Sequence, residues 1–190
     1  MDTHTFTTQA DFAKWLHKNH STSKGVWIRF LKKAHKESSG EKSINYAEAL
    51  DVVLCYGWID STPNKLDEIS YIQKFTLRSP RSIWSKRNRE HVARLVKEKS
   101  MTSAGLAHVD AAKKDGRWAL AYDSAATMKI PEDFLRELSK FKKAEVFFKT
   151  LNKSNLYAIG FRLQTAKKAQ TREKRMQAIL DLLKKARKII

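Results

Sequence analysis

The chain has 190 residues, of which 42% are hydrophobic, 10% aromatic and 31% charged, a balance typical of a folded globular protein. Its 38 Lys and Arg side chains outnumber its 20 Asp and Glu side chains, so the formal net charge is +18. This charge attracts anionic partners and disfavours cationic ones. The single cysteine excludes an intramolecular disulfide.

The first residues, MDTHTFTTQADFAKWL, lack the basic start and the apolar stretch of a secretion signal, so we expect a cytoplasmic protein. The longest apolar runs, such as VVLCYGWI, are much shorter than the ~20 residues that a membrane-crossing helix needs. We therefore expect no membrane span.

The first third of the chain alternates helical and extended patterns. Apolar residues at helical spacing predict a helix over residues 8–19, and VWIRFLKK, residues 26–33, predicts a strand. The polar stretch that follows, HKESSGEKS, is expected to be a mobile loop. Asn45 and Glu48 form a capping-box pattern, which predicts a helix that ends at Gly57.

Two further strands are predicted before the chain becomes helical. WIDS, residues 58–61, begins one strand, TPNKLDE turns the chain, and SYIQKFTLR, residues 70–78, alternates as a half-buried strand does. The order helix, strand, helix, strand, strand predicts a small sheet with helices packed on one face.

After Pro80 the whole sequence is predicted to be helical. One helix starts at Ser79, Ser82 or Ser85 and turns Trp84, Val92, Leu95 and Val96 inward, and others are expected over residues 103–115, from 131, over 155–166 and over 171–188. The fold class is therefore α+β, with an α+β module over residues 1–100 and an all-helical module over residues 101–190.

The stretch LCYGWIDSTPNK, residues 54–65, raises the question of whether Cys55 is reactive. Cys55 is predicted in the last turn of a helix, at the negative end of its dipole, with Asp51 one turn before it. Both influences raise a thiol pKa, so we expect Cys55 to pack rather than react. Glu48, Asp51 and Cys55 make a poor zinc site and the six histidines are scattered, so no metal and no cofactor are expected.

A candidate anion site lies in FTLRSPRSIWSKRN, residues 75–88. Arginine forks and the N–H groups at a helix start bind phosphate, and an exposed tryptophan can stack on a base. The candidate anion-binding residues are Asp60, Arg78, Arg81, Ser82, Trp84, Ser85, Lys86 and Asn88. In the alternative interpretation, Trp84 lies in the core, Asp60 pairs with Arg78 or Arg81, and the other charges are solvated.

A second candidate is the basic C-terminal stretch, because residues 140–190 contain fifteen Lys and Arg against three acidic residues. The candidates are Arg162, Lys167, Lys168, Arg172 and Arg175. On one face they could follow a phosphate backbone, with an affinity that falls as salt rises. The alternative is a solvated helix face whose other side packs.

Several long segments carry a resemblance to a known family. They are SINYAEALDVVLCYGWIDS (43–61), KFTLRSPRSIWSKRN (74–88), MTSAGLAHVDAAKKDGRWALAY (101–122), IPEDF (130–134) and FFKTLNKSNLYAIGFRLQTAKKAQTREKRM (147–176). In these segments the chain resembles the YdeI/OmpD-associated family, also described as bacteriocin-protection proteins. The resemblance implies an α+β module followed by a helical one, and an association with tolerance of bacteriocins or other antimicrobial peptides. The family usually has a proline where this chain has Leu77.

Three functions remain open from the sequence. The first is a stress or antimicrobial-tolerance protein that acts by binding an anionic partner, such as nucleic acid, a phosphorylated metabolite or an acidic protein. The second is a nucleic-acid-binding protein without sequence preference. The third is an enzyme that uses Asp60 with Arg78 or Arg81 on a phosphorylated small molecule. A deep pocket at Asp60 would favour the enzyme, and a flat basic face would favour nucleic acid.

Overall fold

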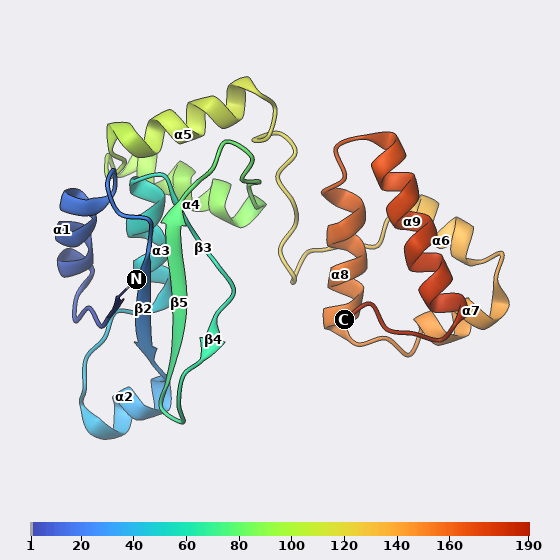
Figure 1. Cartoon of the computed structure of the whole chain (residues 1–190), viewed down its shortest axis with the longest axis horizontal. Helices are drawn as coiled ribbons and strands as arrows, with labels where there is room; N and C mark the ends of the chain where they lie inside the picture. Colours follow the sequence, from blue (N-terminus) through green and yellow to red (C-terminus); the bar gives the residue numbers. More distant parts are fainter. Residues whose placement is uncertain (1) are drawn as a thin grey trace. The chain divides into compact units, whose positions relative to one another are not determined.

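The structure, a computed structural model, describes residues 2–190. The fold class is α+β, as predicted, because a sheet with helices is followed by helices alone (Figure 1). The chain forms two compact units. The first contains the residues up to 83 together with 88–119, and the second contains residues 84–87 together with 120–190.

The sheet of the first unit is built around one long strand. Its strands are β1 (Thr3–His4), β2 (Val26–Leu31), β3 (Trp58–Asp60), β4 (Asn64–Lys65) and β5 (Ser70–Leu77). The order is β1-β2-β5-β3, with β4 also beside β5. β1 runs parallel to β2, and the other pairs are antiparallel. Phe75 is opposite Val26 on one side and Asp60 on the other, so these three side chains share a face of the sheet.

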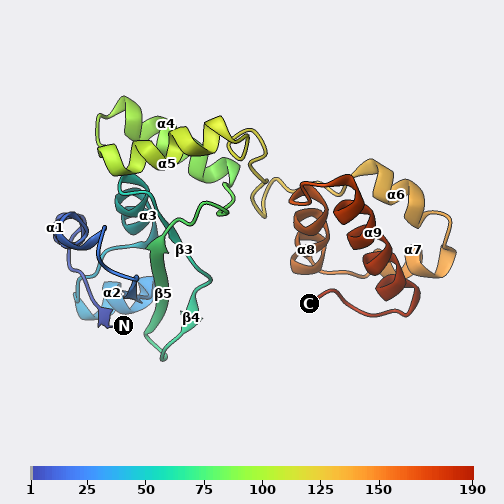
Figure 2. The same ribbon diagram turned by 45° about the horizontal axis from the view of Figure 1, so that its top comes forward.

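Helices α1 (Gln9–Asn19) and α3 (Tyr46–Cys55) cover that face. Figure 2 shows both helices on the same side of β5. Phe12 of α1 lies edge-on to Phe75, with ring centroids 6.2 Å apart, and both side chains are fully buried. The predicted capping box starts α3, since Asn45 and Glu48 each accept a backbone N–H from the other. Gly57 follows the helix with a φ of 73°.

A short helix replaces part of the predicted mobile loop. α2 (Lys33–Ser39) contains no buried residue, so it has no apolar stripe by which the sequence could have revealed it. Lys33 forms an ion pair with Glu37 one turn later, at 3.6 Å, and Gly40 ends the helix in the left-handed conformation.

Two further helices follow the sheet, α4 (Lys86–Lys97), which belongs to the first unit from Asn88 onward, and α5 (Ser103–Lys114). On α4, Leu95 is buried as predicted, but Val96 is 48% exposed, so its inward placement was wrong. α5 begins against the end of α3, because the Thr102 hydroxyl donates to the Cys55 carbonyl at 2.6 Å. A Cβ at Gly105 would collide with that same carbonyl, so the contact requires glycine.

The second unit consists of α6 (Glu132–Leu138), α7 (Lys142–Phe148), α8 (Lys153–Gln164) and α9 (Ala169–Lys184). The predicted buried stripe of α9 is confirmed and consists of Met176, Ile179, Leu180 and Leu183. It packs with residues of the other three helices, including Phe134, Ala144 and Ile159. The sequence did not predict α7. None of the helices formed by residues 2–190 combines the length and apolar character that crossing a bilayer would need.

Candidate functional site

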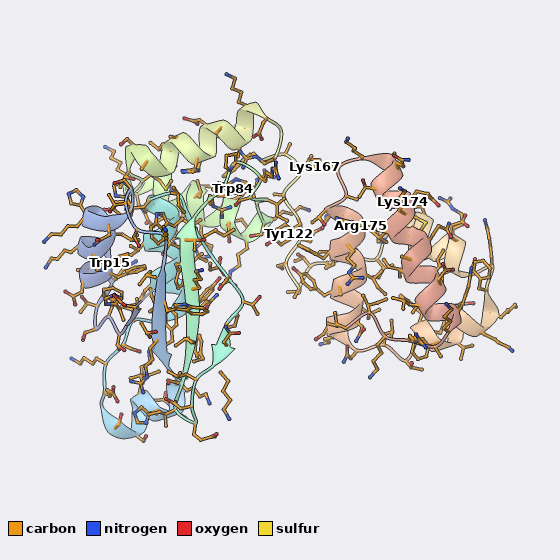
Figure 3. All side chains as sticks on the ribbon, in the orientation of Figure 1. Trp15, Trp84, Tyr122, Lys167, Lys174 and Arg175 are labelled. Carbon is orange, nitrogen blue, oxygen red and sulfur yellow. The ribbon has the colours of Figure 1, made fainter. Side chains whose placement is uncertain are left out.

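The segment over residues 78–88 divides into buried and exposed side chains. Arg78 is 2% exposed and donates to the Ile83 carbonyl at 3.1 Å, so its guanidinium group is part of the interior. Trp84 is 1% exposed and lies in the core, where its ring is not presented for stacking (Figure 3). Ser85 and Asn88 are buried too, and Ser82 is half-buried.

Residues 84–86 are held by a strand-like pairing with Tyr122. The Tyr122 N–H donates to the Trp84 carbonyl at 3.0 Å, and the Lys86 N–H donates to the Tyr122 carbonyl at 2.8 Å. Lys86 and Arg81 keep exposed side chains, and Lys86 forms an ion pair with Asp123 at 2.7 Å. Of the eight candidates from the sequence, only Arg81 and Lys86 therefore present an exposed cation.

Asp60 bonds to two neutral side chains rather than to Arg78 or Arg81, the partners that the sequence suggested. The Tyr46 hydroxyl donates to its Oδ2 at 2.9 Å, and the Gln73 amide donates to the same atom at 3.2 Å. Gln73 is 3% exposed and also donates to the Ser61 carbonyl. Asp60 thus takes part in a local network that joins α3, β3 and β5.

Cys55 lies in the last turn of α3, as predicted, and is 7% exposed. Burial, followed by the nearby Asp51 carboxylate, raises the pKa of the thiol to about 11, although the charge of Arg94 acts in the opposite direction. The thiol is therefore protonated at neutral pH. Among residues 2–190 there is no group of three His, Cys, Asp or Glu side chains that could hold a metal ion.

The sequence did not reveal a cavity of about 430 Å³ beside Cys55, which α1, α3 and α4 enclose. One wall is charged: Arg94 donates to Asp51 at 2.6 Å and to Glu98 at 2.9 Å, and His91 bonds to Asp51 at 2.7 Å. Hydrogen bonds to Asp51 and Glu98 raise the pKa of Arg94, which stays charged. Since these ion pairs neutralise the carboxylates and the thiol is protonated, this wall provides no nucleophile activated at neutral pH.

Two of the basic C-terminal candidates support the fold of the second unit. Arg172 donates through both terminal nitrogens to Asp133, with one contact at 2.9 Å, and this pairing lowers the pKa of Asp133. Arg175 donates to the Arg162 carbonyl at 2.7 Å and to the Thr165 hydroxyl at 3.2 Å, so it satisfies the C-terminal end of α8.

The remaining basic residues around the connection from α8 to α9 are exposed. Lys167 and Lys168 lie in the connection and Lys174 lies on α9, and we call these three the α8–α9 basic surface. Figure 3 shows Lys167 and Lys174 at the end of the unit where α8 leads into α9. Lys168 is the N-cap of α9, and the first turn of that helix contains no acidic residue. Its exposed N–H groups therefore add to the positive potential of the lysines.

The three acidic side chains of residues 140–190 each contact a neighbour on their own helix. Glu145 pairs with Lys149 at 3.0 Å, Asp181 pairs with Lys184 at 3.5 Å, and Glu173 accepts a hydrogen bond from Gln177 at 2.8 Å. Glu173 keeps its charge beside Lys174, because its partner Gln177 is neutral, but fifteen basic side chains against three acidic ones leave residues 140–190 strongly positive.

Comparison with known families identifies both parts of the chain. Residues 4–108 match the family described as "Domain of unknown function (DUF8412)", and residues 127–186 match the family described as "Bacteriocin-protection, YdeI or OmpD-Associated". No curated protein and no solved structure matches the chain. The second match covers α6 to α9 and confirms the resemblance for the segments 130–134 and 147–176, whereas the segments 43–61 and 74–88 lie within the DUF8412 match. The chain therefore belongs to the DUF8412 family, and its C-terminal part is a YdeI/OmpD-associated domain.

Proposed function

We propose that this chain binds nucleic acid through the α8–α9 basic surface of its YdeI/OmpD-associated domain. The observation that carries the proposal is the exposure of Lys167, Lys168 and Lys174, while the acidic residues of the same stretch bond to other side chains. Three lysines beside a helix N-terminus form a positive surface suited to the phosphates of a nucleic-acid backbone.

Phosphate contacts predict binding without sequence preference. Lysine is a flexible point charge and does not read base edges in the way that a bidentate arginine does. Two arginines of the basic stretch, Arg172 and Arg175, are bonded to Asp133 and to the end of α8, and Arg162 remains exposed in the last turn of α8. The lysines therefore provide affinity and steering without base recognition.

The charge also limits how the domain could contribute to bacteriocin protection, which its family description names. A protein of net charge +18 repels cationic peptides. A contribution to tolerance would therefore act through an anionic component of the cell, with nucleic acid as the partner, rather than by sequestering the peptide.

An enzyme acting on a phosphorylated small molecule has less support. Asp60 accepts hydrogen bonds from Tyr46 and Gln73 rather than from an arginine, and Arg78 is buried. Cys55 is a protonated thiol at neutral pH. We therefore retain the binding function as the proposal.

Charge reversal at the α8–α9 basic surface tests this proposal. The variant Lys167→Glu/Lys168→Glu/Lys174→Glu should weaken binding to labelled random single-stranded RNA and duplex DNA by about tenfold or more, measured by fluorescence anisotropy. The matched control is Lys14→Glu/Lys18→Glu/Lys24→Glu, which reverses three exposed lysines of the first unit and changes the net charge equally. Equal losses in the two variants would mean that only net charge matters and would contradict the proposed surface.

A further inference from the structure

A second cavity, of about 580 Å³, lies within the second unit along one side of α8. Its lining includes Tyr157, Ala158 and Phe161 of α8, together with Ala125 and Ala126 of the segment that precedes α6. We call it the α8 cavity. Its volume lies within the roughly 300–1,000 Å³ typical of small-molecule sites, and its lining is mostly carbon.

The charged side chains that line the α8 cavity are both cations. Lys153 and Arg162 line it, and the hydroxyl groups of Ser154 and Tyr157 lie between them on α8. These residues follow one another at helical spacing, so they form one face, with the two cations about 14 Å apart along the helix axis. Burial raises the pKa of Tyr157, which therefore remains a hydrogen-bond donor at neutral pH.

Hydrogen bonds within the protein hold the walls of the α8 cavity in place without a ligand. Asp123 and Gln164 bond reciprocally: the Asp123 N–H donates to the Gln164 amide oxygen at 3.0 Å, and the Gln164 amide donates to Asp123 Oδ2 at 2.7 Å. This pair ties the segment that carries Ala125 to the end of α8. Near the start of α8, buried Asn155 accepts the N–H groups of Ile189 and of Ile190, which also lines the cavity, at 2.8 and 3.2 Å.

The aromatic rings are also held in place. Tyr122 meets Phe161 edge-on, with ring centroids 4.9 Å apart, and Tyr157 lies 5.8 Å from Phe161. Because these rings have fixed neighbours, a ligand that packs on them does not first have to order the wall, which lowers the entropic cost of binding.

We infer that the α8 cavity binds a small amphipathic anion, in which one carboxylate or similar acidic group is attached to an apolar body. Lys153 or Arg162 would bind the acidic group, and the apolar body would pack along Tyr157, Ala158 and Phe161. A cation would be repelled by both charged side chains. A small polar anion such as free phosphate would leave the carbon-rich walls unused.

This inference is independent of the proposed nucleic-acid binding. Lys167, Lys168 and Lys174 do not line the α8 cavity. Substitutions in the α8 cavity therefore test small-anion binding and leave the α8–α9 basic surface intact. Substitutions of Lys167, Lys168 and Lys174 test nucleic-acid binding and leave the cavity intact.

The test is a fluorescence titration of the full chain with 8-anilinonaphthalene-1-sulfonate, an apolar aromatic anion. We expect saturable binding of one probe per chain, which decanoate displaces and decyltrimethylammonium does not. Lys153→Gln/Arg162→Gln should weaken probe binding about tenfold, because each cation can supply a charge-assisted hydrogen bond. The control Lys167→Gln/Lys168→Gln removes the same charge outside the cavity and should leave probe binding within about twofold.

Two filling variants test the location. Ala158→Trp places an indole inside the α8 cavity, and Ala126→Trp fills it from the segment before α6, at an exposed position where a larger side chain displaces no core residue. Each should abolish saturable probe binding, whereas Ala178→Trp, at an exposed position of α9, should not. The inference is overturned if a filling variant with an unchanged circular dichroism spectrum still binds the probe normally, if the ammonium competes as well as decanoate, or if the wild-type chain shows no saturable binding.

Discussion

Cys55 illustrates how burial and a neighbouring carboxylate decide the chemistry of a side chain. Its thiol lies at the negative end of α3, is 7% exposed, and has Asp51 one turn before it. Burial and the carboxylate raise the thiol pKa to about 11, so the reactive thiolate is scarce at neutral pH. The sequence predicted the direction of this change from the spacing of Asp51, which is a local feature, whereas the largest cause, burial, depends on packing.

The raised pKa predicts a specific pH profile for alkylation of Cys55. The rate of reaction with iodoacetamide should keep rising up to about pH 11, well above the ~8.5 at which an ordinary thiol titrates. Asp51→Asn should shift this midpoint downward, since it removes a charge that disfavours the thiolate. A midpoint near that of free cysteine in the folded wild-type chain would show that the burial argument is wrong.

The ion pair of Asp133 with Arg172 predicts how the free energy of unfolding depends on pH. Arg172 lowers the pKa of Asp133, so the folded state favours the carboxylate more than the unfolded state does. The stabilisation is therefore present above the ordinary carboxyl pKa and is lost as pH falls through the lowered folded-state value. Because the Asp133 side chain is 41% exposed, solvent screening limits the contribution to at most about 1 kcal/mol.

Urea unfolding at several pH values measures this contribution. Asp133→Asn should lower the free energy of unfolding at pH 7, and the difference from wild type should shrink once the solution is acidic enough to protonate the wild-type carboxyl in the folded state. A difference that stays constant over the whole acidic range would indicate that the ion pair is not its source.

At the scale of elements, the contact between α3 and α5 depends on Gly105. A methyl group there would meet the backbone carbonyl of Cys55, which cannot move without displacing the end of α3. We expect Gly105→Ala to lower the free energy of unfolding by roughly 1–3 kcal/mol, as overpacking does. Gly116→Ala is the comparison: it has open space but a φ of 80°, so only conformational strain of roughly 1–2 kcal/mol is expected.

Chemical denaturation of the two variants separates these effects. Gly105→Ser, which adds a still larger side chain, should be at least as destabilising as Gly105→Ala. If Gly105→Ala were as stable as wild type, α5 would not pack on the end of α3 as closely as the structure indicates.

Elements with a strong local signal were predicted from the sequence, and those without one were missed. The capping box of α3, the alternation of β5 and the apolar stripe of α9 each satisfy a simple periodic rule. α2 buries no residue, and α7 buries only Ala144 while Val146 is 67% exposed, so neither shows a stripe. Both helices contain seven residues, and unlike α6, which is equally short, neither has the proline and acidic first turn that mark a helix start nor two buried apolar side chains one turn apart.

The candidate sites were less predictable, because they depend on contacts between distant residues. The sequence could not decide that Asp60 bonds to Tyr46 and Gln73, nor that Arg94 of α4 reaches Asp51 of α3. It also could not separate the arginines that hold the helical unit together, such as Arg172, from the lysines that remain exposed. A basic stretch of sequence predicts a positive net charge, but only the folded structure shows which cations form ion pairs and hydrogen bonds and which remain exposed.

At the scale of the whole molecule, the chain joins two compact units, each with its own core. The first unit contains the sheet and α5, and the second contains the helices of the YdeI/OmpD-associated domain. The charge is unevenly distributed, since residues 140–190 carry fifteen basic and three acidic side chains. An uneven field of this kind makes the second unit the more strongly attractive of the two for an anion.

The central claim is that the second unit binds the phosphate backbone, and the salt dependence of binding tests it most directly. Association constants for random single-stranded RNA would be measured by fluorescence anisotropy between roughly 50 and 200 mM salt. Contact with three or more phosphates predicts a slope of about −2 or steeper in a plot of log K against log salt, and the Lys167→Glu/Lys168→Glu/Lys174→Glu variant should flatten that slope. A wild-type slope near zero, or no binding at the lowest salt, would contradict the proposed function.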